Sequence, residues 1–298
     1  SMGTTGVSGD HGAKKAWKDA DVILAAGNSF AKWSTWKFNE EIFDNKRLYR
    51  INIDKDEISR FYQSDNYLVS DVKPAIKRIN EVLESEVKDI PSKAYQKDKF
   101  ADENIEYDGD QIHPGQLTQK LSQLLPEDSI ILGDAGGHML WLHSYLNLSD
   151  NQLYQNPGSF GPMGSHVNAA MGIKAANPDR PVISVCGDGD YQMAGFELMT
   201  AVENEIPVVW VIFNNSEFNI IKMFQLRVKD KEVFNRFLNP DYKKYAEICG
   251  ATGYRVENLE DFDEAFEEAI SLGKPAIIDV QVDPEVYPPF EEYNPDED

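Results

Sequence analysis

Short apolar runs alternate with amphipathic stretches along most of the chain. The second half gives the clearest series, with strands expected at 129–132, 182–186, 207–213 and 276–282. Helices are expected around them at 116–125, 138–146, 166–176, 194–204, 240–249 and 259–272. Continuous apolar strands separated by helices are typical of a parallel sheet covered on both faces. The pattern predicts an α/β fold, a doubly wound, mostly parallel sheet with helices on both faces.

The first part of the chain carries fewer elements. Two strands are clear, Val22 to Ala26 and Leu48 to Ile53, and a helix is expected over "DVKPAIKRINEVLES". Two strands are too few for a sheet of ordinary width, so this region is expected to be a partial α/β central domain. The predicted organisation is that domain at 3–88, a polar linker at 89–114, the main domain at 115–290 and a solvated acidic tail at 291–298.

Composition narrows the class of protein. The 298 residues include 51 acidic and 29 basic side chains, for a net charge of -22, which argues against a nucleic-acid surface because phosphate contacts depend on Lys and Arg. No apolar run approaches the roughly 20 residues that cross a bilayer, and no N-terminal signal is evident. The two cysteines lack CxxC spacing and are expected to be reduced core residues. A soluble cytoplasmic protein is expected.

Candidate chemistry lies in "VISVCGDGDYQMAGFELMTAVENEIPVVWVIFNN", which runs from Val182 to Asn215. Ligands of open parallel sheets bind beyond the carboxyl ends of the strands, where Asp188 and the two terminal asparagines are expected to lie. A right-handed crossover makes the two strand ends neighbours. Carboxylate, amide and carbonyl oxygens suit Mg²⁺, and glycines allow close approach of a phosphate. The stretch predicts a clamp for Mg²⁺ and a diphosphate.

Other interpretations of the same residues stay open. A Gly-Asp-Gly triplet is most often a tight turn, and an Asn pair commonly ends a strand. A calcium-binding EF-hand is excluded, because the register from Asp188 places Gln192, Met193 and Met199 where a ligand, the glycine and the closing glutamate belong. Phosphoryl transfer that uses Asp188 and Asp190 is a further alternative, although the chain has no P-loop.

The joint pattern of Gly-Asp-Gly, 24 residues and Asn-Asn resembles the thiamine-diphosphate signature of the acetolactate synthase and pyruvate oxidase superfamily. Three more segments resemble parts of the diphosphate-binding domain of that superfamily: "LGDAGGHMLW", "GSFGPMGSHVNAAMGIKAANPDRPV" and "KPAIIDVQVDPEVYPP". In the first region, "TGVSGDHG", "ADVILAAG" and "INIDKDEIS" resemble the later half of its central domain.

The resemblance implies thiamine diphosphate and Mg²⁺ as cofactors and assigns residues to them. The implied metal ligands are the side chains of Asp188 and Asn215 and the main-chain carbonyl of Glu217. The implied cofactor-binding residues are Gly136, Gly137, His138, Gly161, Met163, Gly187, Gly189, Asp190 and Ile220. Within this set, Gly189 and Asp190 would offer main-chain N–H groups, Gly161 would offer its carbonyl to the aminopyrimidine, and Met163 would hold the cofactor bent.

The implied activity is decarboxylation or carboligation of a 2-keto acid, most like acetolactate synthase, in a homo-oligomer. A pyruvate oxidase-like enzyme is the near alternative, and a non-catalytic cofactor-binding or assembly module is the alternative of another class. No residue of this chain matches the catalytic glutamate of the family's pyrimidine-binding domain, so that domain is expected from another segment or chain, and the chain alone is expected to be inactive. Asp190, Gly137, Lys222 and Phe224 depart from the residues common in the family.

Overall fold

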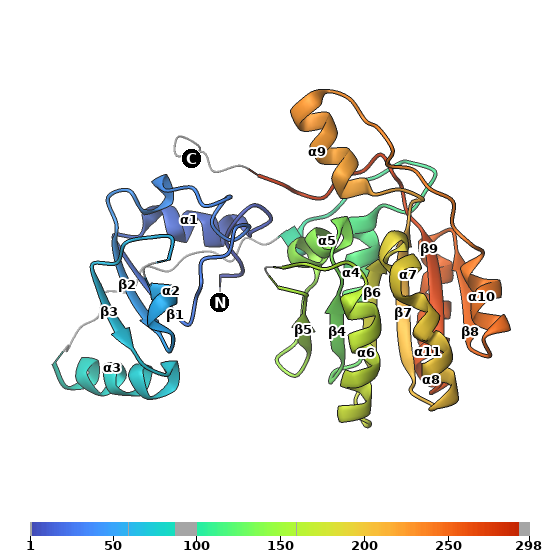
Figure 1. Cartoon of the computed structure of the whole chain (residues 1–298), viewed down its shortest axis with the longest axis horizontal. Coiled ribbons are helices and arrows are strands. Elements are labelled where there is room, and N and C mark those ends of the chain that lie inside the picture. Colours follow the sequence, from blue (N-terminus) through green and yellow to red (C-terminus); the bar gives the residue numbers. More distant parts are fainter. Residues whose placement is uncertain (1, 59, 87–99, 159, 292–298) are drawn as a thin grey trace. The chain divides into compact units, whose positions relative to one another are not determined.

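The computed structural model describes residues 2–58, 60–86, 100–158 and 160–291. The chain divides into two compact units, one of Ser1–Phe100 with Phe290–Asp298 and one of Ala101–Pro289 (Figure 1). Each unit is an α/β structure, so the predicted fold class is confirmed. Among the described residues, no helix combines the length and the apolar content that a membrane crossing requires.

The first unit contains a parallel sheet in the order β1-β2-β3. Its elements are α1 (His11–Asp19), β1 (Val22–Ala26), the 3-10 helix η1 (Glu41–Phe43), β2 (Arg47–Asn52), α2 (Lys55–Ile58), β3 (Asn66–Val69) and α3 (Val72–Glu86). The expectation of only two strands was therefore wrong. β3 gave no pattern to read, because it is a four-residue edge strand whose residues are all exposed.

Two segments differ from the predicted domain boundaries. Phe290 packs in the first unit with its ring 5.9 Å from that of Trp33, and Glu291, expected in a solvated tail, donates its main-chain N–H to Val7 and pairs with Lys14. The described end of the predicted linker belongs to the second unit, where the buried Ile112 bridges to Val282. The remainder of these two expected segments, 89–99 and 292–298, lies outside the described residues.

The second unit is built on a parallel sheet in the order β5-β4-β6-β7-β9-β8. Its strands are β4 (Ile130–Gly133), β5 (Leu153–Gln155), β6 (Val182–Gly187), β7 (Val208–Asn214), β8 (Thr252–Val256) and β9 (Ala276–Gln281). The longer helices are α4 (Pro114–Leu124), α5 (Gly137–Tyr145), α6 (Ser165–Ala176), α9 (Asn219–Lys229) and α11 (Leu259–Ser271). Shorter helices are η2 (Phe100–Asp102), α7 (Asp188–Ala194), η3 (Gly195–Glu197), α8 (Leu198–Glu203) and α10 (Tyr242–Ile248).

Both faces of this sheet are covered, as the apolar strands predict (Figure 1). Successive side chains of a strand point to opposite faces, so Val209 and Val211 of β7 face α4, α5 and α11, whereas Trp210 faces α6, α7, α8 and α10. Trp210 is fully buried and donates its indole N–H to the carbonyl of Val167 at 2.9 Å. The two apolar cores hold the central strands in place and thereby position the carboxyl edge of the sheet.

The sequence pattern missed the two edge strands, β5 and β8, and the helix α9, and it misplaced one helix. The helix expected at 194–204 begins directly at Asp188 as α7 and is broken by η3 before α8. Within α8, Leu198 and Ala201 are buried in the core. Because α7 follows β6 without a loop, Asp188 is a first-turn residue of a helix and not the centre of an open turn.

Candidate functional site

The site residues converge on the carboxyl edge of the large sheet, near a change in the direction of the chain. From β4 the chain moves to β5 on one side, and from β6 it moves to β7 on the other. Such a switch point leaves a crevice outside the strand ends, where ligands of α/β sheets bind. The loops and helix starts that follow β4, β6 and β7 lie at this edge of the sheet (Figure 1).

Asp134, the residue directly after β4, anchors the loop that precedes α6. Its side chain is fully buried and accepts hydrogen bonds from the main-chain N–H groups of Gly164 at 3.1 Å, His166 at 2.8 Å and Val167 at 3.0 Å. A carboxylate at the start of a helix satisfies N–H groups that have no partner within the helix. Asp134 was not among the predicted site residues, although a carboxylate directly after a buried strand is a usable signal.

Four of the predicted cofactor-binding residues, Gly136, His138, Gly187 and Asp190, pack together between the ends of β4 and β6. Asp190 accepts the N–H of Gly187 at 2.8 Å, and its Oδ2 lies 3.5 Å from Nε2 of His138. A Cβ added at Gly136 would lie 2.7 Å from Cε1 of His138. Glycine is therefore required there by a close approach, as expected of a cradle.

The His138 and Asp190 side chains are almost fully buried, which favours the uncharged form of each. Burial lowers the pKa of His138 to about 4 and raises the pKa of Asp190 well above its ordinary range. Their atoms Nε2 and Oδ1 have no hydrogen-bond partner among the described residues. The carboxyl group of Asp190 faces Gly187 and His138, so its departure from the family pattern adds no exposed negative charge to the crevice.

A second group of residues that pack together consists of Gly189, Met163 and Phe218. A Cβ on Gly189 would lie 2.7 Å from the Phe218 ring and 3.4 Å from Cε of Met163. Met163 is 37% exposed, so it is not a core side chain. Gly161 has a φ of 57° in the loop before it, a conformation that favours glycine.

Two further predicted residues lie at the start of α9. Gly137 faces this helix, since a Cβ there would lie 3.6 Å from Oδ1 of Asn219. Ile220 is half-buried in its first turn.

Asp188 joins the ends of β6 and β7. Its Oδ2 accepts hydrogen bonds from the N–H of Ser216 and from Nδ2 of Asn239, both at 2.7 Å, and its Oδ1 accepts the N–H of Gly189 at 3.0 Å. Asn215 precedes Ser216, and its Oδ1 accepts the N–H of Glu217 at 3.3 Å. The predicted metal ligands thus come from adjacent strand ends, while Asn239, from the segment before α10, was missed by the sequence analysis.

Asn214 lies at the end of β7, as expected, and its side chain joins β7 to β9 and to Asn239. Its Nδ2 donates to Oδ1 of Asp279 in β9 at 2.7 Å, and its Oδ1 accepts from Asn239 at 2.7 Å. Of the two asparagines, Asn214 is therefore a link between strands. The second oxygen of Asp279, which is 1% exposed, has no hydrogen-bond partner among the described residues.

Asp279→Asn is expected to flatten the pH dependence of stability. Burial raises the pKa of Asp279 from 3.8 to about 6, so this group stabilises the fold below pH 4, and its contribution is lost as the pH rises through about 6. The difference amounts to about 2–3 kcal/mol. Denaturant unfolding from pH 4 to 7 should show the free energy of the wild type falling by that amount relative to the variant, and parallel curves would contradict the assignment.

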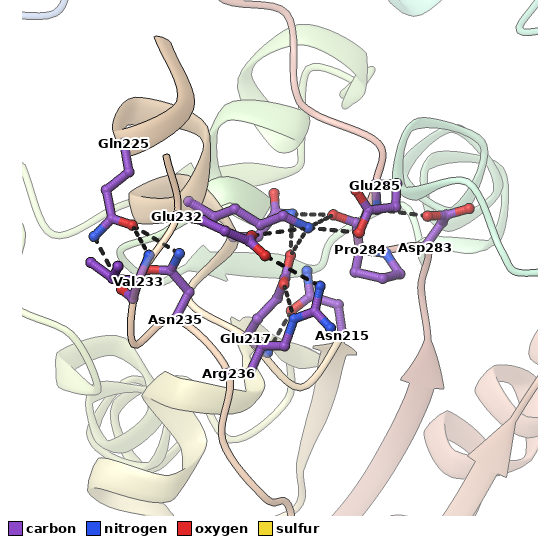
Figure 2. A network of polar contacts seen from close by, with 12 residues as sticks. Asn215, Glu217, Gln225, Glu232, Val233, Asn235, Arg236, Asp283, Pro284 and Glu285 are labelled. Atoms are coloured by element: carbon purple, nitrogen blue, oxygen red, sulfur yellow. Dashed lines mark hydrogen bonds and ion pairs between the residues drawn. The ribbon is translucent and has the colours of Figure 1, made fainter. Parts of the chain in front are cut away.

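Glu217 is the third predicted metal ligand, through its main-chain carbonyl, and its side chain turns inward. It is 4% exposed and accepts hydrogen bonds from Nδ2 of Asn219 at 3.0 Å and from Nζ of Lys222 at 3.2 Å (Figure 2). The side chain of Glu217 is therefore occupied by contacts within the protein, and the predicted contact with Mg²⁺ falls to its main-chain carbonyl.

The residues present fit a cofactor of the predicted kind. Among the described residues, no three His, Cys, Asp or Glu side chains gather as a metal site, but the expected ligands are one carboxylate, one amide and one main-chain carbonyl. These are the hard oxygen donors that Mg²⁺ takes when phosphates complete its coordination. The buried Nε2 of His138, which has no hydrogen bond among the described residues, and the closely packed Gly136 and Gly189 fit a diphosphate beside them.

The fold and the edge cluster define a doubly wound α/β domain with a candidate site at the carboxyl ends of its strands, and comparison with known families specifies its family. Residues 134–280 match the family model of the thiamine pyrophosphate enzyme C-terminal TPP binding domain, and residues 1–79 match that of the central domain of the same enzymes. The chain belongs to the thiamine pyrophosphate enzyme family.

Known relatives align with almost the whole of this chain and are identical to it at about one residue in four. A putative thiamine pyrophosphate-containing protein of Bacillus subtilis, YdaP, is 26% identical, with 94% of this chain and 49% of the relative covered. The acetolactate synthase isozyme 3 large subunit of Escherichia coli is 28% identical, with 96% and 52% covered. A probable acetolactate synthase large subunit of Methanocaldococcus jannaschii is 28% identical, with 95% and 50% covered. The chain spans about half the length of these relatives.

Proposed function

We propose that the second unit binds the diphosphate end of thiamine diphosphate with Mg²⁺ and serves the decarboxylation or carboligation of a 2-keto acid, as in acetolactate synthase. The observation that carries this proposal is the position of Asp188, at the end of β6 and bonded to Ser216 in the loop after β7. That position lies within the stretch that matches the TPP binding domain. The similarity to acetolactate synthases favours this chemistry over phosphoryl transfer.

In this proposal, each group of residues has one task. Asp188, Asn215 and the carbonyl of Glu217 would hold the metal, and Gly136, Gly137 and His138 would line the diphosphate. The main-chain N–H groups of Gly189 and Asp190 remain candidates for phosphate contacts, although Gly189 donates to Asp188 without the cofactor. Gly187 contributes space instead of a donor, because its N–H is used by Asp190.

The remaining residues act on the organic part of the cofactor. Gly161, Met163 and Ile220 would contact its rings. Thiamine diphosphate, when bound, supplies the carbanion and the electron sink for decarboxylation. A pyrimidine-binding domain from another segment or chain would supply the catalytic glutamate, and the assembly would be a homo-oligomer of the complete unit.

Titration calorimetry with thiamine diphosphate tests the proposal. Binding is expected in the presence of Mg²⁺, with at least a tenfold weaker dissociation constant after EDTA treatment, because the metal neutralises the diphosphate beside Asp188. Thiamine without phosphates is the matched control and should not respond to Mg²⁺. Absence of metal-dependent binding by the folded protein would refute the cofactor assignment.

A non-catalytic cofactor-binding or assembly module is the second candidate. Mixing this chain with a separately expressed pyrimidine-binding domain and assaying pyruvate decarboxylation separates the two. Turnover by the mixture, with none from either part, is expected for an enzyme. A verified complex without turnover would favour the module. Formation of acetolactate or of an oxidised product would then distinguish acetolactate synthase-like from pyruvate oxidase-like chemistry.

A further inference from the structure

Lys222 in α9 is a buried cation whose amine pairs with carboxylates of the same chain. Its side chain is 2% exposed, and its Nζ lies 2.7 Å from Oε1 of Glu285, 3.2 Å from Oε1 of Glu217 and 4.0 Å from Oε2 of Glu232. Figure 2 shows these three carboxylates converging from different segments of the chain. Burial alone lowers the pKa of Lys222, but the hydrogen bonds with Glu285 and Glu217 outweigh it, and the pKa lies above its ordinary value.

These contacts join the loops that follow two neighbouring strands. Glu217 follows β7, Glu285 follows β9, and the two strands pair in parallel. Asn219 adds a second link, because its Nδ2 contacts both Oε1 of Glu217 at 3.0 Å and the carbonyl of Pro284 at 2.7 Å. The first turns of α9 therefore connect the loop at 215–217 to the segment at 284–285.

The loop at 215–217 needs such support. Ser216 has a φ of 58°, in the left-handed region that is uncommon for residues other than glycine. The loop pairs with the returning chain through Phe218 N–H to Asn235 at 2.8 Å and Phe237 N–H to Ser216 at 3.1 Å. A buried carboxylate without a partner is strongly unfavourable. Glu217 is held in its inward position by the amine of the buried Lys222 and the amide of Asn219, and the exposed Arg236 adds a longer contact of 3.8 Å to its Oε2.

We infer that Lys222 is a positioning residue, which fixes the side chain of Glu217 and thereby the conformation of the loop at 215–217. The link from this loop to Mg²⁺ rests on the proposed function, whereas the anchoring itself does not. The same geometry makes Lys222 unavailable to a substrate carboxylate, because its amine is already bound by carboxylates of the chain.

Amide hydrogen exchange of the full chain tests the anchoring without cofactor. In Lys222→Met, exchange at 216–218 is expected to be about tenfold faster, since the methionine keeps the length of the side chain and removes its charge. Lys222→Arg should stay within threefold of the wild type. Lys244→Met is the matched control, because Lys244 pairs with Asp241 on the exposed surface of the same unit. Exchange in Lys222→Met within twofold of the wild type would overturn the inference.

A second variant covers the case in which Lys222→Met does not fold. Glu285 has a side chain that is 66% exposed, so Glu285→Gln keeps the core intact while it removes the shortest ion pair of Lys222. About threefold faster exchange at 216–218 is expected, and no change in this variant would contradict the inference.

Titration of Mg²⁺ at a fixed concentration of thiamine diphosphate separates the inference from the proposed function. Lys222→Met is expected to raise the Mg²⁺ concentration for half-maximal cofactor binding at least tenfold, with recovery to within threefold in Lys222→Arg. If a folded Lys222→Met variant needs the same Mg²⁺ concentration as the wild type, the inference about Lys222 is overturned and the proposed function is not. If the wild type itself does not bind the cofactor, the proposed function fails, and hydrogen exchange still decides the role of Lys222.

Discussion

Asp188→Asn is expected to weaken Mg²⁺-dependent binding of thiamine diphosphate at least 100-fold. The substitution removes the one carboxylate among the proposed metal ligands, and a loss of about 3 kcal/mol corresponds to a factor of about 100 in the dissociation constant. Asparagine keeps an oxygen that can accept from Ser216 and Asn239. The measurement is titration calorimetry at saturating Mg²⁺.

The fold of this variant should be unharmed, which makes the binding result interpretable. Burial raises the pKa of Asp188 to about 6, so the carboxylate is held in the fold at a cost when it is charged at neutral pH. The free energy of unfolding at pH 7 is expected to stay within about 1 kcal/mol of the wild type or to rise. Asp150→Asn, on the exposed surface, is the control. Binding within threefold of the wild type would exclude Asp188 as a metal ligand.

Asp134→Ala is expected to lower the free energy of unfolding by about 3–5 kcal/mol. The substitution leaves the N–H groups of Gly164, His166 and Val167 without their acceptor. Hydrogen bonds to a charged group contribute about 1.5–3 kcal/mol each, and such contributions are not additive. Denaturant unfolding followed by circular dichroism measures the change.

The matched control is Asp128→Ala, an exposed aspartate before the same strand whose bond to Arg180 uses the main-chain carbonyl. That substitution should cost less than about 0.5 kcal/mol. Because Asp134 also orders the loop that carries Met163, Asp134→Asn at a temperature where it stays folded should weaken cofactor binding. Equal stability of Asp134→Ala and Asp128→Ala would contradict the role given to Asp134.

The central strands could be predicted from the sequence because burial on both faces demands a continuous apolar run. β6 and β7 are buried along almost their entire length, and the predicted bounds differ from the observed ones by at most one residue at either end. The edge strands β3, β5 and β8 carry exposed or mixed positions, so their sequences lacked the periodicity on which the prediction depends.

The candidate site likewise contains some residues that could be predicted from the sequence and others that could not. Gly187, Asp188 and Asn215 could be found because they directly follow apolar strands, and strand ends of a parallel sheet share one edge. Asn239 and the role of Asp134 could not be found from local pattern. Their partners lie far along the chain, 51 residues from Asn239 to Asp188 and 30 from Asp134 to Gly164.

The sequence by itself determined the α/β class, the buried strands and the positions of the chemical groups that follow them, because these depend on apolar periodicity and chain order. The tertiary structure alone decided which polar groups meet. Lys222 shows the difference, since only the parallel pairing of β7 with β9 brings Glu285, 63 residues away, to its amine. Ion pairs and hydrogen bonds act over a few ångströms in space, and distance along the chain does not specify that separation.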